Sequence, residues 1–302
     1  LMGVPMPDRE AEPLKYLSLR YSMPEWVIKM WQQTYSFGQI EKILEAFLAK
    51  QPTAIRVNPL KTTKEELEKE LKAAQVQVKD PGLIDVLFLE GYDTLERIPA
   101  FTAGKFHVQD VSSMQVGLWA DPKEGNYVLD VCAAPGGKSI HMAELLNGTG
   151  LVEARDLTEH KVSLIRENIA RCQLPNICAK AADARVLDKE KVGKADIVVA
   201  DLPCSGLGVI GRKADIKYRL KETACRELAA LQREILHTVR QYVKPGGALL
   251  YSTCTINYEE NEGNAAWFLQ GHPEFCLEQQ KQILPQKGMC DGFFLAKFRK
   301  KE

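Results

Sequence analysis

The sequence has no excess of charge of either sign, because 40 lysines and arginines are balanced by 40 aspartates and glutamates. Any nucleic acid must therefore be bound by a local basic patch and not by the field of the whole protein. No apolar run approaches the roughly 20 residues of a membrane-spanning helix, so no membrane partner is expected. The eight cysteines include no C-x-x-C pair, and no cysteine or histidine cluster has zinc-ligand spacing, which argues against a metal site.

Disulfides are not expected, although the cysteine count is even. No secretory leader is recognisable, and several cysteines fall in apolar strand or helix patterns, as small buried hydrophobes do. We therefore expect a soluble monomer in the reducing cytoplasm. The first residues, 1–8 with the sequence LMGVPMPD, fit neither an initiator context nor a periodic element and indicate a truncated or processed N-terminus.

The pattern of apolar residues predicts three parts. Residues 1–50 form a helical segment, because apolar residues recur at helical spacing with a break near Ser36. Residues 51–122 form a small α+β subdomain with a helix capped by Thr63. Its expected strands lie at 53–58, 76–78 and 86–89, and its expected helix at 63–74. A subdomain of this kind either binds RNA or only packs against its neighbour, and composition does not separate the two.

The third part, residues 123–302, alternates short apolar runs with helices. The expected strands are 127–131, 150–154, 177–181, 197–200, 248–251, 275–277 and 292–297, and the expected helices are 138–146, 159–172 and 223–243. Strands of about five residues that alternate with longer helices predict an α/β, Rossmann-like domain with a parallel sheet covered on both faces. Ligands of such sheets bind at the carboxyl ends of the strands.

A loop with two glycines, residues 130–138 (DVCAAPGGK), follows the first of these strands. It lacks the G-x-G-x-x-G pattern of dinucleotide-binding folds, and by itself it fits a plain strand-to-helix turn equally well. Acidic residues at the next strand ends favour a ligand, since Asp156 is positioned for ribose hydroxyls and Asp183 for an adenine amino group. Carboxylates repel phosphate and attract a sulfonium and an ammonium, so we predict S-adenosylmethionine as the cofactor. The predicted cofactor-binding residues are Cys132, Ala133, Ala134, Pro135, Gly136, Gly137, Lys138, Asp156, Asp183 and Asp201.

Two further cysteines follow strand-like runs, Cys204 in DLPCSG (201–206) and Cys254 in YSTCT (251–255). A lone cysteine is more often a buried structural thiol, but the small polar neighbours of these two favour a chemical role. Carbon 5 of a pyrimidine has no lone pair, so its methylation requires a thiolate that adds to carbon 6 and a base that removes the carbon-5 proton. Asp201 has the right type and place to hold the N3/N4 edge of the base.

Taken together, these motifs resemble the RsmB/NOP group of RNA cytosine-C5 methyltransferases. The resemblance rests on the loop 130–138, the aspartates 156, 183 and 201, both cysteine motifs, EENE at 259–262, RVNP at 56–59 and QDVSS at 109–113. It implies that Cys254 is the nucleophile and that Cys204 assists product release, whereas DNA cytosine-C5 methyltransferases take their nucleophile from the Pro-Cys motif. The chain departs from the family at Thr255, where serine is usual, and at Ala214, where proline is usual.

The resemblance implies an RNA partner, with 16S rRNA as the expected substrate and the target base flipped or single-stranded. Bacterial small-subunit rRNA members of the group carry an additional N-terminal helical RNA-binding domain. The candidate phosphate contacts are Arg56, Lys61, Arg212 and Lys213. Two alternatives stay open: a methyltransferase that acts on tRNA or DNA, and an rRNA-binding assembly factor without catalysis. The intact Cys254, Cys204 and Asp201 count against the second.

Overall fold

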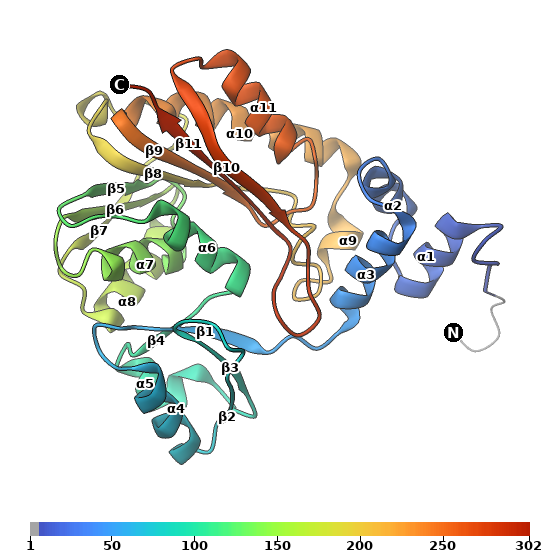
Figure 1. Cartoon of the computed structure of the whole chain (residues 1–302), viewed down its shortest axis with the longest axis horizontal. Helices are drawn as coiled ribbons and strands as arrows, with labels where there is room; N and C mark the ends of the chain where they lie inside the picture. The colour runs from blue at the N-terminus through green and yellow to red at the C-terminus, as the bar shows by residue number, and fades with distance from the viewer. Residues whose placement is uncertain (1–5) are drawn as a thin grey trace.

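The computed structural model describes residues 6–302 and contains three parts (Figure 1): a group of N-terminal helices, a small four-stranded sheet and a large seven-stranded sheet. The first five residues of the predicted 1–50 helical segment, with most of the unusual start, lie outside the described range. Within that range, no helix is both long and apolar enough to cross a bilayer.

The predicted helical segment contains three helices, α1 (Pro13–Tyr21), α2 (Glu25–Gln32) and α3 (Phe37–Leu48). Ser36 caps α3 in a capping box with Gln39, at the break in the apolar pattern. The helices pack on Leu207 and Ile256, which follow the two cysteine motifs. Trp31 of α2 is 1% exposed and donates a hydrogen bond of 2.7 Å to the carbonyl of Ile256. The N-terminal helices therefore support the loops that carry Cys204 and Cys254.

The small sheet is antiparallel, with the strand order β2-β3-β1-β4. Thr63 forms the expected capping box at the start of its main helix. The elements of this part are β1 (Thr53–Val57), α4 (Lys64–Ala73), β2 (Gln77–Lys79), β3 (Val86–Glu90), α5 (Pro99–Thr102) and β4 (Phe106–Val108). The prediction missed β4, because its buried His107 and exposed Val108 reverse the expected alternation of apolar and polar residues.

Helix α6 (Val111–Ala120) was also missed, and it packs on both the large and the small sheet. Its Val116 and Ala120 join Ile140 in the core beneath the large sheet, and the helix contacts strands β9 and β11 of that sheet. Its Met114 packs with Ala54 and Phe88 of the small sheet, so α6 lies between the two parts, and the boundary at residue 122 stays a prediction. The helix escaped prediction because apolar and small residues surround it, so no single face shows a 3.6-residue period.

The large sheet has the order β10-β11-β9-β8-β5-β6-β7. Its strands are β5 (Tyr127–Asp130), β6 (Leu151–Asp156), β7 (Ile177–Ala181), β8 (Ala195–Asp201), β9 (Val243–Thr253), β10 (Phe275–Ile283) and β11 (Phe293–Lys300). Neighbouring strands from β9 to β7 are parallel, and β11 runs antiparallel to both β9 and β10. The predicted Rossmann-like sheet is confirmed.

Helices cover both faces of this sheet, as predicted. Figure 1 shows α10 (Glu222–Val239) and α11 (Glu262–Gly271) on one side, with α6, α7 (Gly137–Leu145) and α8 (Glu159–Cys172) on the other. The short α9 (Ile216–Arg219) lies near the N-terminal helices. Strands β6 and β7 lie on one side of β5, and the chain then crosses to the other side to form β8 and β9; such a switch point forms a crevice at the carboxyl ends of the strands.

Candidate active site

The two cysteine motifs meet at the carboxyl ends of β8 and β9. These strands are parallel neighbours in register from Ile197 to Asp201, where Asp201 pairs with Ser252. Cys204 and Cys254 follow the paired ends, and their sulfur atoms lie 3.4 Å apart. The loop after Cys204 is tied to the other motif because the amide of Gly208 donates to the carbonyl of Cys254 at 3.0 Å. The fold thus brings two thiols from distant parts of the sequence into contact.

The surroundings of the two thiols differ in charge. The hydrogen bond with Cys204 lowers the pKa of the Cys254 thiol, and the positive charges of Lys138 and Lys213 lower it further. The same hydrogen bond raises the pKa of Cys204 well above its ordinary value, and burial and the negative charge of Glu260 act in the same direction. Of the two, Cys254 is therefore the thiol that ionises first.

Both thiols open into one cavity of about 410 Å³ that also contains the glycine loop and the acidic strand ends. Its polar side includes Asp156, Asp183 and Asp201, and its apolar side includes Leu202 and Ile235. A cavity of this volume is in the range of small-molecule sites. Each of the three carboxylates is paired with a cation, so the cavity offers them as hydrogen-bond acceptors in a setting of balanced charge.

The glycine loop is held by the first of these carboxylates. Asp156 is 3% exposed, and its Oδ2 accepts a hydrogen bond of 3.0 Å from the amide of Ala134. Gly136 adopts φ +110°, which only glycine tolerates readily, and it permits the sharp entry into α7. A Cβ at Gly137 would meet no atom within 4 Å, so the backbone there is open to a ligand.

Two predicted cofactor residues have partners that the sequence did not reveal. Asp183 forms an ion pair with Arg185 at 2.6 Å, and the hydrogen bonds from this arginine lower the pKa of the carboxyl. Lys138 lies on the first turn of α7, and its Nζ donates to Asp201 at 2.7 Å. The positive charge of Lys138 therefore faces Asp201 and Cys254, on the thiol side of the cavity.

A buried polar network beneath the thiols was missed as a site feature, although its EENE motif was recognised. Glu260 is fully buried and accepts hydrogen bonds from Ser205, Asn257 and Gln232. The hydroxyl of Ser205 also lies 2.6 Å from that of Thr255. Since Ser205 follows Cys204 and Thr255 follows Cys254, this carboxylate joins the two thiol-bearing loops.

The four candidate phosphate contacts differ in their exposure and in their partners. Arg56 is 4% exposed and paired with the buried Glu144, which disfavours the expected phosphate contact at this residue. Lys61 donates to the carbonyl of Ala103, and Arg212 pairs with Asp291 and Asp110. Lys213 is exposed and close enough to Cys254 to lower its pKa. The burial of Arg56 could not be read from its strand alone, because its partner lies on a distant helix.

The fold is shared with solved structures. The crystal structure of PH0851 superimposes with a TM-score of 0.91 at 33% identity, and the match covers 99% of this chain and 70% of that one. A methyltransferase homolog protein from Pyrococcus horikoshii gives a TM-score of 0.80 at 27% identity, with coverage of 95% and 99%. These likenesses extend over nearly the whole chain and include the small subdomain.

Sequence comparison identifies the family to which the chain belongs. The chain is 39% identical to the probable ribosomal RNA small subunit methyltransferase B of Bacillus subtilis, over 99% of this chain and 71% of the relative. It is 36% identical to ribosomal RNA small subunit methyltransferase B of Yersinia pseudotuberculosis, over 93% and 67%. The RsmF/B-like ferredoxin-like domain model matches residues 23–92. The family is S-adenosylmethionine-dependent. Because the 16S rRNA methyltransferase RsmB/F model matches residues 117–299, the chain belongs to this methyltransferase family.

Proposed function

We propose that the protein methylates carbon 5 of a cytidine in RNA, with 16S rRNA as the substrate, through a covalent bond between Cys254 and carbon 6. The single observation that carries this proposal is the pair of thiols, 3.4 Å apart, in the same cavity as the acidic strand ends. A methyltransferase that acts on an oxygen or a nitrogen needs no thiol, because the lone pair of the acceptor attacks directly. Two thiols in contact suit methylation of a pyrimidine carbon, because one thiol can add to carbon 6 and the other can remove the proton from carbon 5.

The chemistry begins at Cys254, the thiol with the lowered pKa. Its sulfur forms a bond to carbon 6, and the electron pair of the C5–C6 double bond makes carbon 5 nucleophilic. S-adenosylmethionine, when bound, supplies the electrophilic methyl group. Asp156 and Asp183 are the proposed partners of its ribose and adenine, and Asp201 is proposed to hold the N3/N4 edge of the cytosine.

The second thiol is proposed to act in the release of the product. The hydrogen bond with Cys254 is the main cause of the raised pKa of Cys204. Once the sulfur of Cys254 is bound to carbon, that cause disappears and the pKa of Cys204 falls, while burial and the charge of Glu260 still raise it. We propose that Cys204 then gives its proton to solvent and acts as the base. It then takes the proton from carbon 5, the C5–C6 double bond re-forms, and the electron pair of the C6–S bond returns to Cys254.

The substrate assignment rests on the family and on the names of the relatives. Both relatives compared above are named for the small ribosomal subunit RNA. The alternative of a tRNA substrate involves the same chemistry, since the thiols act on the base and not on the strand. The intact thiol pair and its buried support disfavour a binding factor without catalysis, for which neither would be needed.

A pair of cysteine variants tests the mechanism. Cys254→Ala is expected to abolish both methylation and covalent attachment to RNA. Cys204→Ala is expected to leave a protein–RNA adduct that survives a denaturing gel, because the bond to carbon 6 forms but is not released. The control is Cys178→Ala, an exposed cysteine on β7. An adduct with Cys254→Ala and none with Cys204→Ala would reverse the assignment, and bisulfite sequencing of 16S rRNA and tRNA identifies the substrate.

A further inference from the structure

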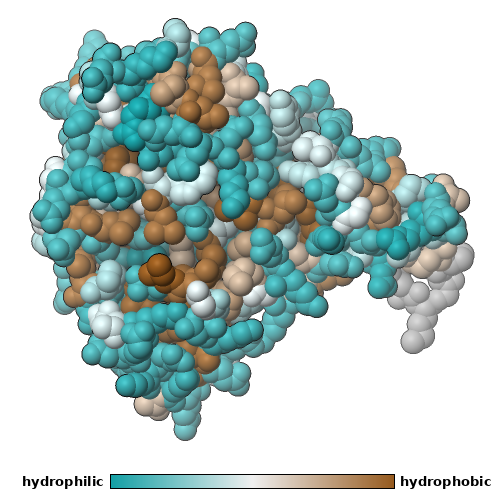
Figure 2. Space-filling model, viewed as in Figure 1, coloured by the Kyte–Doolittle hydropathy of each residue, from teal (hydrophilic) through white to brown (hydrophobic). Residues whose placement is uncertain are grey.

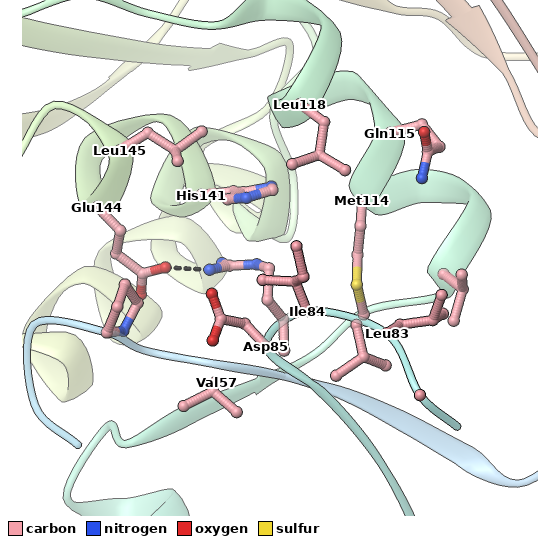
Figure 3. Close-up of a pocket in the computed structure, with 15 residues that line it drawn as sticks. Val57, Leu83, Ile84, Asp85, Met114, Gln115, Leu118, His141, Glu144 and Leu145 are labelled. Carbon is pink, nitrogen blue, oxygen red and sulfur yellow. Dashed lines mark hydrogen bonds and ion pairs between the residues drawn. The ribbon is translucent and has the colours of Figure 1, made fainter. Parts of the chain in front are cut away.

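A second cavity, of about 380 Å³, lies between the small sheet and helices α6 and α7. Figure 3 shows Met114 and Leu118 extending from α6 on one side, and Leu83 and Ile84 from the loop before β3 on the other. The side chains at its rim are exposed: Ile84 is 91% and Leu118 57% accessible. Figure 2 shows apolar surface between the small sheet and the large domain on this face. The cavity is therefore open to solvent and mostly apolar.

One wall of this cavity is polar. His141 of α7 is 5% exposed, and its Nδ1 has no hydrogen-bond partner within the described part of the chain. Burial lowers the pKa of this imidazole well below its ordinary value. The ring is therefore neutral at physiological pH. Its Nδ1 lies against Gly117 of α6, so the nitrogen that can exchange a hydrogen bond with a ligand in the cavity is Nε2.

Arg56 completes the polar wall. Its Nε donates to Gln109 at 2.9 Å and its Nη1 pairs with Glu144, which Figure 3 marks by a dashed line, while the buried Nη2 has no partner among residues 6–302. Unpaired buried polar atoms are rare and costly in native proteins, so a partner from outside is expected to supply the missing hydrogen bonds.

The position of the histidine is set by the crossing of α6 and α7. A Cβ at Gly117 would lie 2.2 Å from the Nδ1 of His141, so α6 approaches the ring as closely as glycine allows. The polar wall of the cavity has no net charge, because Glu144 neutralises Arg56. A phosphate would find no uncompensated positive charge here, whereas a neutral planar ring would find apolar walls and a polar edge.

The cavity is connected to the thiol site. Arg212, from the loop after Cys204, pairs with Asp110, the residue that caps α6. Lys138, which faces Asp201, lies one helical turn before His141 on α7. The loop after Cys204 and the first turns of α7 therefore link the thiol site to two walls of this cavity.

We propose that this cavity binds an unpaired nucleobase of the RNA substrate, next to the cytidine that enters the thiol site. The faces of the base contact Met114, Leu118 and Ile84, and its edge exchanges hydrogen bonds with His141 and Arg56. Every nucleobase has a donor and an acceptor side by side on one edge, which matches this wall. The inference rests on the proposed function, because it requires that the substrate is RNA.

The first test fills the cavity. Leu118→Trp places a large side chain at its mouth, and Leu151→Trp, an exposed leucine at the opposite end of the sheet, is the matched control. Fluorescence anisotropy with in vitro transcribed 16S rRNA fragments measures RNA affinity, and calorimetry measures S-adenosylmethionine affinity. Leu118→Trp should weaken RNA binding about tenfold or more, the scale of one lost base-stacking contact. The salt dependence should stay unchanged, because no phosphate contact is removed.

The outcomes separate this inference from the proposed function. Equal RNA affinity of Leu118→Trp and the control would overturn the nucleobase site while the cysteine chemistry stands, as would a weakened affinity with a reduced salt dependence. Failure of the unmodified protein to bind or methylate RNA would instead contradict the proposed function.

The second test locates the base directly. A photo-crosslinking benzoylphenylalanine at position 114, with the same group at position 151 as the control, is irradiated with the RNA, and mass spectrometry identifies the linked nucleotide. A crosslink within a few nucleotides of the methylated cytidine is expected from position 114 alone. Equal crosslinking from both positions, or none from position 114, would contradict the proposal.

Discussion

The thiol site and the cavity between the subdomains both contain buried polar groups, but they satisfy them differently. Beneath the thiols, Glu260 has partners on both cysteine-bearing loops and on α10. In the cavity, His141 and Arg56 keep buried nitrogen atoms without a partner in the described chain.

The difference indicates that the thiol site is rigid before the substrate binds, whereas the cavity has hydrogen-bonding groups that are free to bind a ligand. A fully satisfied network fixes the geometry of the sulfur atoms before any substrate arrives, which a reaction at carbon 6 requires. A wall with unpaired atoms gains its last hydrogen bonds only when a ligand enters, which suits recognition. Variants that remove partners should therefore harm the first region most.

The largest effect is expected from Glu260→Ala. The change leaves the donors of Ser205, Asn257 and Gln232 buried without an acceptor, and we expect it to cost about 3–5 kcal/mol of the free energy of unfolding. Urea unfolding measures this loss. Glu260→Gln keeps the shape and should be milder in stability, yet still slow adduct formation, because the loops lose a shared acceptor. Wild-type adduct kinetics in Glu260→Gln would contradict a positioning role.

The next effect concerns the polar wall of the cavity. Glu144→Gln leaves the charge of Arg56 buried and uncompensated, which should lower the free energy of unfolding by about 3 kcal/mol. The control Glu278→Gln breaks a pair with Arg299 in which both side chains are about a third exposed, and a change of roughly 1 kcal/mol or less is expected. Similar losses in both variants would mean that the Arg56–Glu144 pair is no more important than a surface pair.

The cofactor side of the thiol cavity offers a smaller effect. Asp156→Ala should weaken S-adenosylmethionine binding about 10- to 100-fold, the scale of a lost charged hydrogen bond, as measured by calorimetry. Asp121→Ala, at an exposed helix end, is the control. Unchanged affinity in Asp156→Ala would remove the aspartate from the ribose site.

The smallest effect is a shift in pH dependence. Lys138 is one of the charges that lower the pKa of Cys254, so Lys138→Met should raise this pKa and move the acidic limb of the reaction to higher pH. Iodoacetamide alkylation across the pH range measures the thiolate directly, with Lys161→Met, beside Asp156, as the control. A profile that moves to lower pH, or no movement, would contradict the electrostatic role of Lys138.

Much of the fold could be predicted because its signals are local. The short apolar runs of the large sheet, the capping boxes at Ser36 and Thr63, and the glycine loop all depend on residues a few positions apart. The prediction missed one strand, β4, and four α-helices, α5, α6, α9 and α11. Two of them show the reason: β4 pairs a buried histidine with an exposed valine, and α6 is a helix without a polar face. Periodicity detects a boundary between core and solvent, and neither element lies on a clear one.

The sequence by itself determined the chemistry that is available: two thiols after strands, a glycine loop and acidic strand ends. Only the tertiary structure decided which of these groups meet. It brought the sulfur atoms to 3.4 Å, turned Lys138 toward Asp201, and buried Arg56 against Glu144. The physical reason is that a side chain's partner, burial and pKa depend on neighbours from distant strands and helices, which local sequence patterns do not specify.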